Sequence, residues 1–93
     1  MDFEYDWHPD KAAANLKKHK ISFQEASTCF RDPLAVTFPD GEHSDGESRF
    51  LTFGESVSGR VLIVSHTESE LHGIRIISAR KADRNERKIY EES

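Results

Sequence analysis

The chain has one cysteine among its 93 residues, so no disulfide can form within it. A lone cysteine suits a reducing compartment. Cys29 falls on a segment that we predict to be the apolar face of a helix. We therefore interpret it as a buried packing thiol, and a nucleophilic thiol is the alternative.

Long hydrophobic runs are absent too. The longest apolar stretch, residues 61–64, is far shorter than the roughly 20 residues that span a bilayer. The first six residues are acidic, unlike the positively charged start of a signal peptide. With 35% hydrophobic and 32% charged residues, the sequence predicts a soluble cytoplasmic protein with one domain over residues 1–93 and no membrane contact.

Metal and cofactor motifs are also missing from the sequence. Its five histidines include no pair at the i, i+4 spacing of a helical metal site, and one cysteine supports no zinc knuckle. The acids of residues 40–47 lack the spacing of a calcium loop, and no glycine-rich phosphate loop is present. We expect neither a metal nor a cofactor.

Positive charge is scarce overall but locally concentrated. The net charge of -4 argues against a protein that coats nucleic acid. Residues 11–20 nevertheless contain four lysines and no acid, and residues 75–88 are predominantly basic. Two basic segments in an acidic protein predict a local anion site. The alternative is a pair of ordinary solvated helix faces.

Periodicity and capping signals predict a small α+β domain of order β-α-α-β-β-β-β-α. Short turns between consecutive strands favour a curved, mainly antiparallel sheet, with an N-terminal helical hairpin, a C-terminal helix, and the helices on one face. Two spacings, Ser22 to Glu25 and Asp83 to Glu86, predict capping boxes. The expected strands cover residues 2–7, 34–38, 49–54, 60–67 and 74–79, the helices 9–19, 23–30 and 83–91, and residues 39–48 form a loop.

The remaining polar residues suit cleavage of RNA without a metal. RNA carries its own nucleophile, the 2′-hydroxyl, so the protein has to stabilise phosphate charge and move protons. Arginine binds two phosphate oxygens at once, and both Arg75 and Arg80 follow or interrupt apolar strand residues. Lys18 and His19 end the first predicted helix, and Tyr90 lies on the last.

Each candidate also has a structural explanation. Arg75 is equally well explained as a polar residue on the solvent face of an amphipathic strand. His19 suits the end of a helix, where the helix dipole favours a cation. Tyr90 also fits a core contact of the terminal helix. His66 either lines a cleft or faces solvent.

Over essentially its whole length the sequence resembles the BrnT family of toxins. The most specific stretch is Ile74-Arg-Ile-Ile-Ser-Ala-Arg80, followed by Ala82, Glu86-Arg87 and Tyr90. The earlier residues that carry the resemblance are Trp7-His-Pro9, Lys11, Asn15, Lys18-His19, Ser22-Phe23, Glu25-Ala26, Phe30, Asp32-Pro33, Glu47, Arg49, Gly54 and Gly59-Arg60.

The resemblance implies a fold similar to RelE-type ribonucleases and RNA cleavage that arrests translation and growth. It also implies a BrnA-like antitoxin partner in a hetero-oligomer, with two copies of each chain as one arrangement, which binds operator DNA only as the complex. Arg75, Arg80, His19 and Tyr90 would then be the catalytic residues. The RNA-binding residues would be Lys18, Arg49, His66 and Arg84.

The sequence departs from the family pattern at three positions. His8 replaces an aspartate that would cap the first helix, and Lys20 replaces a glycine. Ser69 replaces an arginine that would contact phosphate. Three functions follow as hypotheses: a metal-independent endoribonuclease toxin, a catalytically degenerate module that binds the antitoxin and controls the operon, and a nucleic-acid-binding domain in its own right.

Overall fold

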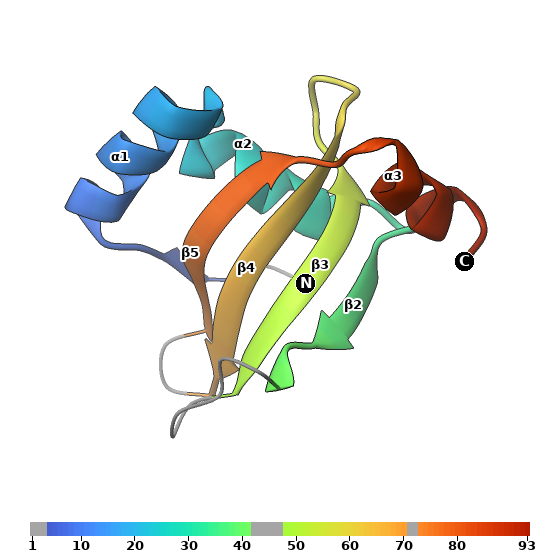
Figure 1. Cartoon of the computed structure of the whole chain (residues 1–93). Coiled ribbons are helices and arrows are strands. Elements are labelled where there is room, and N and C mark those ends of the chain that lie inside the picture. The colour runs from blue at the N-terminus through green and yellow to red at the C-terminus, as the bar shows by residue number, and fades with distance from the viewer. Residues whose placement is uncertain (1–3, 42–47, 71–72) are drawn as a thin grey trace.

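The computed structural model describes residues 4–41, 48–70 and 73–93. Figure 1 shows a curved sheet with α1 and α2 near β5 and with α3 toward the other edge of the sheet, next to β2. The predicted small α+β domain is confirmed. The elements are β1 (Tyr5–Asp6), α1 (Pro9–His19), α2 (Phe23–Thr28), a 3₁₀ turn (Cys29–Arg31), β2 (Val36–Pro39), β3 (Arg49–Glu55), β4 (Val61–Ser69), β5 (Gly73–Lys81) and α3 (Arg84–Glu91).

Parts of three predicted segments lie outside the described residues. They are residues 2–3 of the first strand, residues 42–47 of the loop, which include Glu47, and residues 71–72 of the turn before β5. Across the rest of the chain, observed and predicted elements differ in length by a few residues at most. No helix among the described residues is both long and apolar enough to cross a membrane.

The five strands form one sheet in the order β1-β5-β4-β3-β2. Strands β2 to β5 pair antiparallel, as short connections require. Strand β1 instead runs parallel to β5, with Tyr5 opposite Ile74, because two helices separate it from the rest of the sheet. The sheet is therefore mixed, with its antiparallel part as predicted.

One face of the sheet is covered by α1 and α2. Its core joins Leu62 and Val64 of β4 and Ile76 of β5 to Phe23 and Ala26 of α2, all almost fully buried. Each large aliphatic or aromatic side chain buried in this way stabilises the fold by roughly 1.5–3 kcal/mol. This layer fixes the position of the helices relative to β5.

The C-terminal helix does not join that layer. Tyr90 of α3 packs against a second cluster, which contains Phe53, Ile63 and Ala82. Ile63 alternates along β4 with Leu62 and therefore faces the opposite side of the sheet. The expectation that all helices gather on one face was wrong, because α3 follows β5 directly and turns onto the end of the other face.

The N-terminal capping of α2 differs from the prediction. The hydroxyl of Ser22 accepts a hydrogen bond from the backbone N–H of Glu25 (3.0 Å), as expected. The Glu25 carboxylate, however, binds Arg60 in a bidentate ion pair (2.6 and 2.8 Å) and accepts hydrogen bonds from Ser56 and Ser58. These contacts lower the pKa of Glu25 to about 2. Glu25 thus fastens the β3–β4 turn to α2 instead of closing a capping box.

Cys29 is buried against the sheet, as predicted. Its thiol donates to the carbonyl oxygen of Gly54 (3.3 Å), and burial raises its pKa to about 12. A Cβ atom at Gly54 would lie 2.9 Å from the Cys29 carbonyl oxygen, so the strand needs glycine at this close approach. The thiol is a packing group with little tendency to ionise.

Helix α1 is capped at both ends by unusual residues. At the start, Nδ1 of His8 accepts a hydrogen bond from the backbone N–H of Asp10 (3.1 Å), so the expected loss of an N-cap was wrong. At the end, Lys20 adopts a left-handed conformation (φ 61°, ψ 28°) that glycine would adopt without strain.

Replacing Lys20 with glycine is expected to raise the free energy of unfolding by about 1 kcal/mol, because a left-handed residue with a Cβ costs roughly that amount. Lys17→Gly, in the last turn of the same helix, is the control and should lower it by about 1 kcal/mol. Urea denaturation at neutral pH measures both changes. Equal destabilisation by the two glycines would show that Lys20 is unstrained.

Candidate functional site

The sheet face away from α1 and α2, which we call the outer face, carries three of the predicted site residues, Arg49, Arg75 and Arg80. Figure 1 is viewed from this side, with β4 and β5 passing in front of α2. Cross-strand partners share a face, so the register defines three rows across β3, β4 and β5. They are the Arg75 row (Arg49, Thr67, Arg75), the middle row (Leu51, Ser65, Ser78) and the Arg80 row (Phe53, Ile63, Arg80).

Arg80 is held at the upper end of the outer face by a bidentate ion pair with Glu86 (2.8 and 2.7 Å). Glu86 also accepts from the backbone N–H of Asp83, so the predicted capping box at the start of α3 is present and keeps the carboxylate in place. The ion pair lowers the pKa of Glu86 to about 2. The Arg80 side chain remains 46% exposed, so its guanidinium is oriented yet accessible to a phosphate.

Arg75 belongs to a separate group at the lower end of the face. It forms an ion pair with Asp6 of β1 (2.9 Å), and Arg49 lies in the same row across Thr67. The β4 partners of Arg75 and Arg80, Thr67 and Ile63, are four residues apart, which is about 13 Å along the strand. Each guanidinium is therefore held by its own carboxylate, Arg75 by Asp6 and Arg80 by Glu86, at opposite ends of the outer face.

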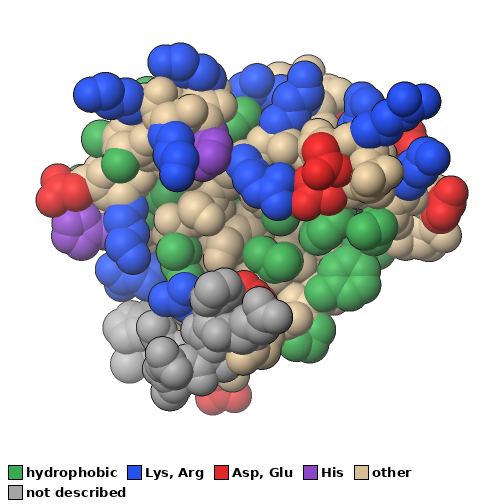
Figure 2. Space-filling model, viewed as in Figure 1, with side chains coloured by type: hydrophobic (Ala, Val, Ile, Leu, Met, Phe, Trp, Pro, Cys, Tyr) green, Lys and Arg blue, Asp and Glu red, His purple; other side chains and the backbone are tan. Residues whose placement is uncertain are grey.

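The end of α1 lies beside the middle of β5. Lys18 and His19 line a groove between the two elements together with Ser78 of the outer face. Basic side chains follow the upper rim of the face in Figure 2, over α1, the end of β5 and α3. Arg84 is exposed at the start of α3, four residues after Arg80. The structure thus brings Lys18 and His19 to the upper half of the face and leaves Arg49 and Arg75 in the lower half.

Asn15 determines how α1 is placed against β5. Its side-chain amide donates to the carbonyl oxygens of Ile21 and Ala79 (2.9 Å each), and its oxygen accepts from the backbone N–H of Ala79 (3.0 Å). The apolar Leu16 of the same helix is 50% exposed, whereas the polar Asn15 is buried. Asn15 lies three residues after Ala12 and four before His19, which is the spacing of residues on one helix face. This spacing was the sequence signal for its position against β5.

Two predicted site residues have side chains that are engaged elsewhere. His66 is fully buried, since it shares the face of Leu62 and Val64 that the helices cover. Its Nε2 is hydrogen-bonded to Thr52 (2.7 Å), and burial lowers its pKa to about 4. The expectation that the His66 side chain either lines a cleft or faces solvent was therefore wrong.

Tyr90 donates its hydroxyl proton to a carboxylate oxygen of Asp32 (2.5 Å) and not to a predicted site residue. This hydrogen bond is the main cause that raises its pKa to about 12. The contact ties α3 to the segment before β2. Tyr90 thus has a structural role in addition to the core contact that the sequence offered as an alternative.

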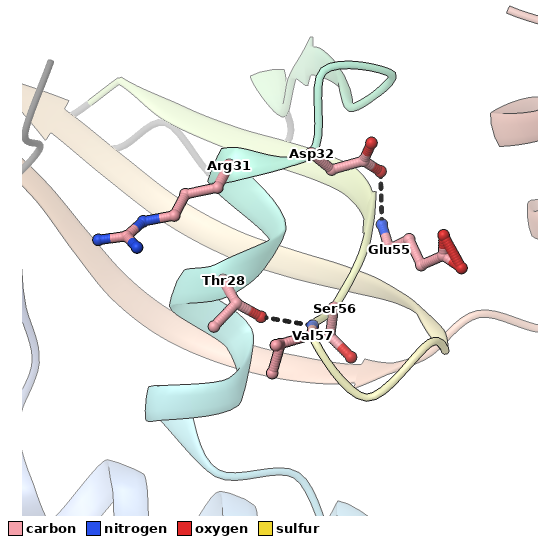
Figure 3. Close-up of a pocket in the computed structure, with 6 residues that line it drawn as sticks. All are labelled: Thr28, Arg31, Asp32, Glu55, Ser56 and Val57. Atoms are coloured by element: carbon pink, nitrogen blue, oxygen red, sulfur yellow. Dashed lines mark hydrogen bonds between the residues drawn. The ribbon is translucent and has the colours of Figure 1, made fainter.

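A second hollow lies at the C-terminal end of β3 and is shown in Figure 3. Its polar groups are used within the fold: Thr28 accepts from the backbone N–H of Val57 (2.9 Å), and Asp32 accepts from that of Glu55 (2.8 Å). None of the predicted site residues lines this hollow in the described chain. Its hydrogen bonds brace the β3–β4 turn against the 3₁₀ segment.

Comparison with known proteins decides the family. A family model described as "Ribonuclease toxin, BrnT, of type II toxin-antitoxin system" matches residues 7–86. This chain belongs to the BrnT toxin family. The resemblance noted in the sequence is thereby confirmed, and the family is one of ribonuclease toxins that act in toxin–antitoxin pairs.

The fold agrees with that of a BrnT toxin of known structure. The 1.1 Å crystal structure of the Brucella abortus ribonuclease toxin BrnT is 21% identical in sequence and superposes with a TM-score of 0.69. The match covers 89% of this chain and 100% of the Brucella chain. No curated protein matches the sequence. Within the described residues of this BrnT-family chain, no three His, Cys, Asp or Glu side chains are grouped closely enough to hold a metal ion.

The role of Asn15 is testable by stability. Asn15→Ala leaves the buried polar groups of Ala79 and Ile21 without partners and is expected to lower the free energy of unfolding by about 3 kcal/mol. Leu16→Ala, one residue along and half exposed, is the control and should cost under about 1 kcal/mol. Chemical denaturation of both variants measures the difference. Equal losses would mean that Asn15 does not fasten α1 to β5.

Proposed function

We propose that this chain is a metal-independent endoribonuclease toxin that cuts RNA at the Arg80 end of the outer face. The observation that carries the proposal is the placement of Arg80, oriented by Glu86 but half exposed, on the strand that the His19 end of α1 adjoins. The role of Arg80 is to bind the scissile phosphate. His19, at the end of α1 beside β5, is the proposed proton-transfer group. The predicted compartment is the cytoplasm, where the translated RNA is found.

The proposed reaction uses the substrate's own 2′-hydroxyl. Its oxygen attacks the adjacent phosphorus, the bond to the 5′ oxygen of the next nucleotide breaks, and the products are a 2′,3′-cyclic phosphate and a 5′-hydroxyl. Negative charge grows on the phosphate oxygens during attack, and the Arg80 guanidinium stabilises it. His19 carries out one of the two proton transfers, accepting the 2′ proton or protonating the leaving 5′ oxygen, and water carries out the other. Lys18 adds positive charge beside His19.

The remaining predicted residues are assigned supporting roles in this proposal. Arg49 and Arg75 lie at the other end of the outer face, where Asp6 holds Arg75, so we assign them to the RNA backbone farther along the strand. Arg84 lies near the upper rim and is a further backbone contact. Tyr90 supports the site indirectly by holding α3, and through it Glu86, against Asp32.

The proposed partner is a BrnA-like antitoxin that covers the outer face. Covering that face would hide Arg80 and the end of α1 together, which is sufficient to block RNA. Operator DNA would be bound by the antitoxin part of the complex, since a chain of net charge -4 has little non-specific affinity for DNA.

One set of observations favours a second function, that of a catalytically degenerate module that binds the antitoxin. The hydroxyl of Tyr90 is taken by Asp32, His66 is buried, and Ser69 replaces a basic residue of the family pattern. Fewer polar groups are therefore available at the site than the family pattern implied.

The proposed function is tested by inducing the wild-type chain, Arg80→Ala and Arg75→Ala in cells without an antitoxin. Loss of the phosphate-binding arginine is expected to reduce cleavage by about 100-fold or more and to abolish growth arrest. Arg75→Ala should weaken RNA binding, seen as a higher KM with kcat retained. Protein synthesis in cells, and RNA cleavage by the purified chain in EDTA, give the two readouts.

Arg87→Ala, an exposed arginine of α3 outside the site, is the matched control and should behave as the wild type. Arrest by wild type and Arg87→Ala but not by equally abundant Arg80→Ala supports the ribonuclease. Soluble wild-type protein that neither arrests growth nor cuts RNA would favour the degenerate module.

A further inference from the structure

The groove between α1 and β5 extends beyond the residues that the proposed reaction uses. It has a volume of about 300 Å³ and is lined by Lys11, Ala14, Asn15, Lys18, His19, Ile77 and Ser78. Ser78 also belongs to the middle row of the outer face, so the groove continues that face sideways onto α1. Asn15, bonded to Ala79, fixes its width.

The floor of the groove is apolar because of an irregularity in β5. Ser65 pairs with Ser78 whereas His66 pairs with Ile76, so Ile77 is an extra residue on β5. Such a bulge redirects the side chain away from the regular alternation of the strand. Ile77 is half-buried and lines the groove together with Ala14, which is exposed. These two side chains offer a nucleobase an apolar surface to pack against.

The rim of the groove is basic. Lys11 and Lys18 are seven residues apart on α1, about 10 Å along the helix axis, and His19 follows directly. No acidic residue is among the described side chains that line the groove. Its charge therefore complements a polyanion, although the protein as a whole is acidic.

We propose that this groove is a nucleotide subsite, which holds the RNA nucleotide next to the scissile phosphate. The base lies over Ala14 and Ile77, Lys11 binds the phosphate on the far side, and Lys18 binds the one nearer to Arg80. The Ser78 hydroxyl is placed to bond the sugar or the base edge. The proposal rests on the proposed ribonuclease function and adds Lys11 to its substrate-binding residues. An acidic antitoxin segment is the competing occupant.

The test uses mixed-sequence RNA oligonucleotides in which fluorine replaces every 2′-hydroxyl, so that they bind but cannot be cut. Fluorescence anisotropy measures their Kd across salt concentrations for the wild type, Lys11→Ala and Lys17→Ala. Lys17 is an exposed lysine of the same helix outside the groove and serves as the control. Loss of one phosphate contact should weaken binding several-fold and reduce the salt slope by about 0.7 in Lys11→Ala alone.

Cleavage of unmodified RNA by the wild type is measured in parallel, to separate this proposal from the one on which it rests. RNA cleavage by wild type with identical Kd and slope in the two lysine variants would overturn the subsite and leave the ribonuclease standing. A wild type that neither binds nor cuts RNA would overturn both. Loss of antitoxin binding in Lys11→Ala, with RNA binding unchanged, would assign the groove to the antitoxin and also overturn the subsite.

Discussion

The site depends on the hydrogen bonds between the side chain of Asn15 and the backbone of Ala79. They tie the middle of α1 to β5 one residue before Arg80, and the same side chain holds the chain leaving the helix through Ile21. A buried amide with three satisfied hydrogen bonds allows little sliding or rotation of the helix, because any shift would leave polar groups unpaired. The positions of Lys18, His19 and the groove beside β5 follow from that constraint.

Electrostatics is arranged locally in a chain that is acidic overall. Both arginines of β5 are paired with carboxylates, Arg75 with Asp6 and Arg80 with Glu86, so each is oriented before a substrate arrives. The two pairs differ in rigidity, because Glu86 is also fixed by the capping box of α3 whereas β1 is a two-residue edge strand. Because of this difference in rigidity, and not because of charge alone, we assign the reaction to the Arg80 end and RNA binding to the Arg75 end.

Local rules predicted the elements of the fold well because alternation, caps and turn residues act over a few positions. What they missed depends on contacts between distant segments. Glu25 fitted a capping box, but its carboxylate meets Arg60, which lies 35 residues away. Alternation placed His66 with Leu62 and Val64, but only the packed helices show that this face is the covered one. The role of Asn15 required knowing which β5 backbone groups α1 would meet, and the bulge at Ile77 left no signal in the sequence.

The central claim is that RNA binds at the Arg80 end of the outer face, beside α1. The most direct measurement is NMR titration of the isotope-labelled chain with an RNA oligonucleotide that lacks the attacking 2′-hydroxyl. The account predicts that shifts concentrate at Ser78, Arg80 and His19, with smaller changes near Arg75. Shifts confined to the hollow between Thr28 and Val57, with the Arg80 end unaffected, would contradict it.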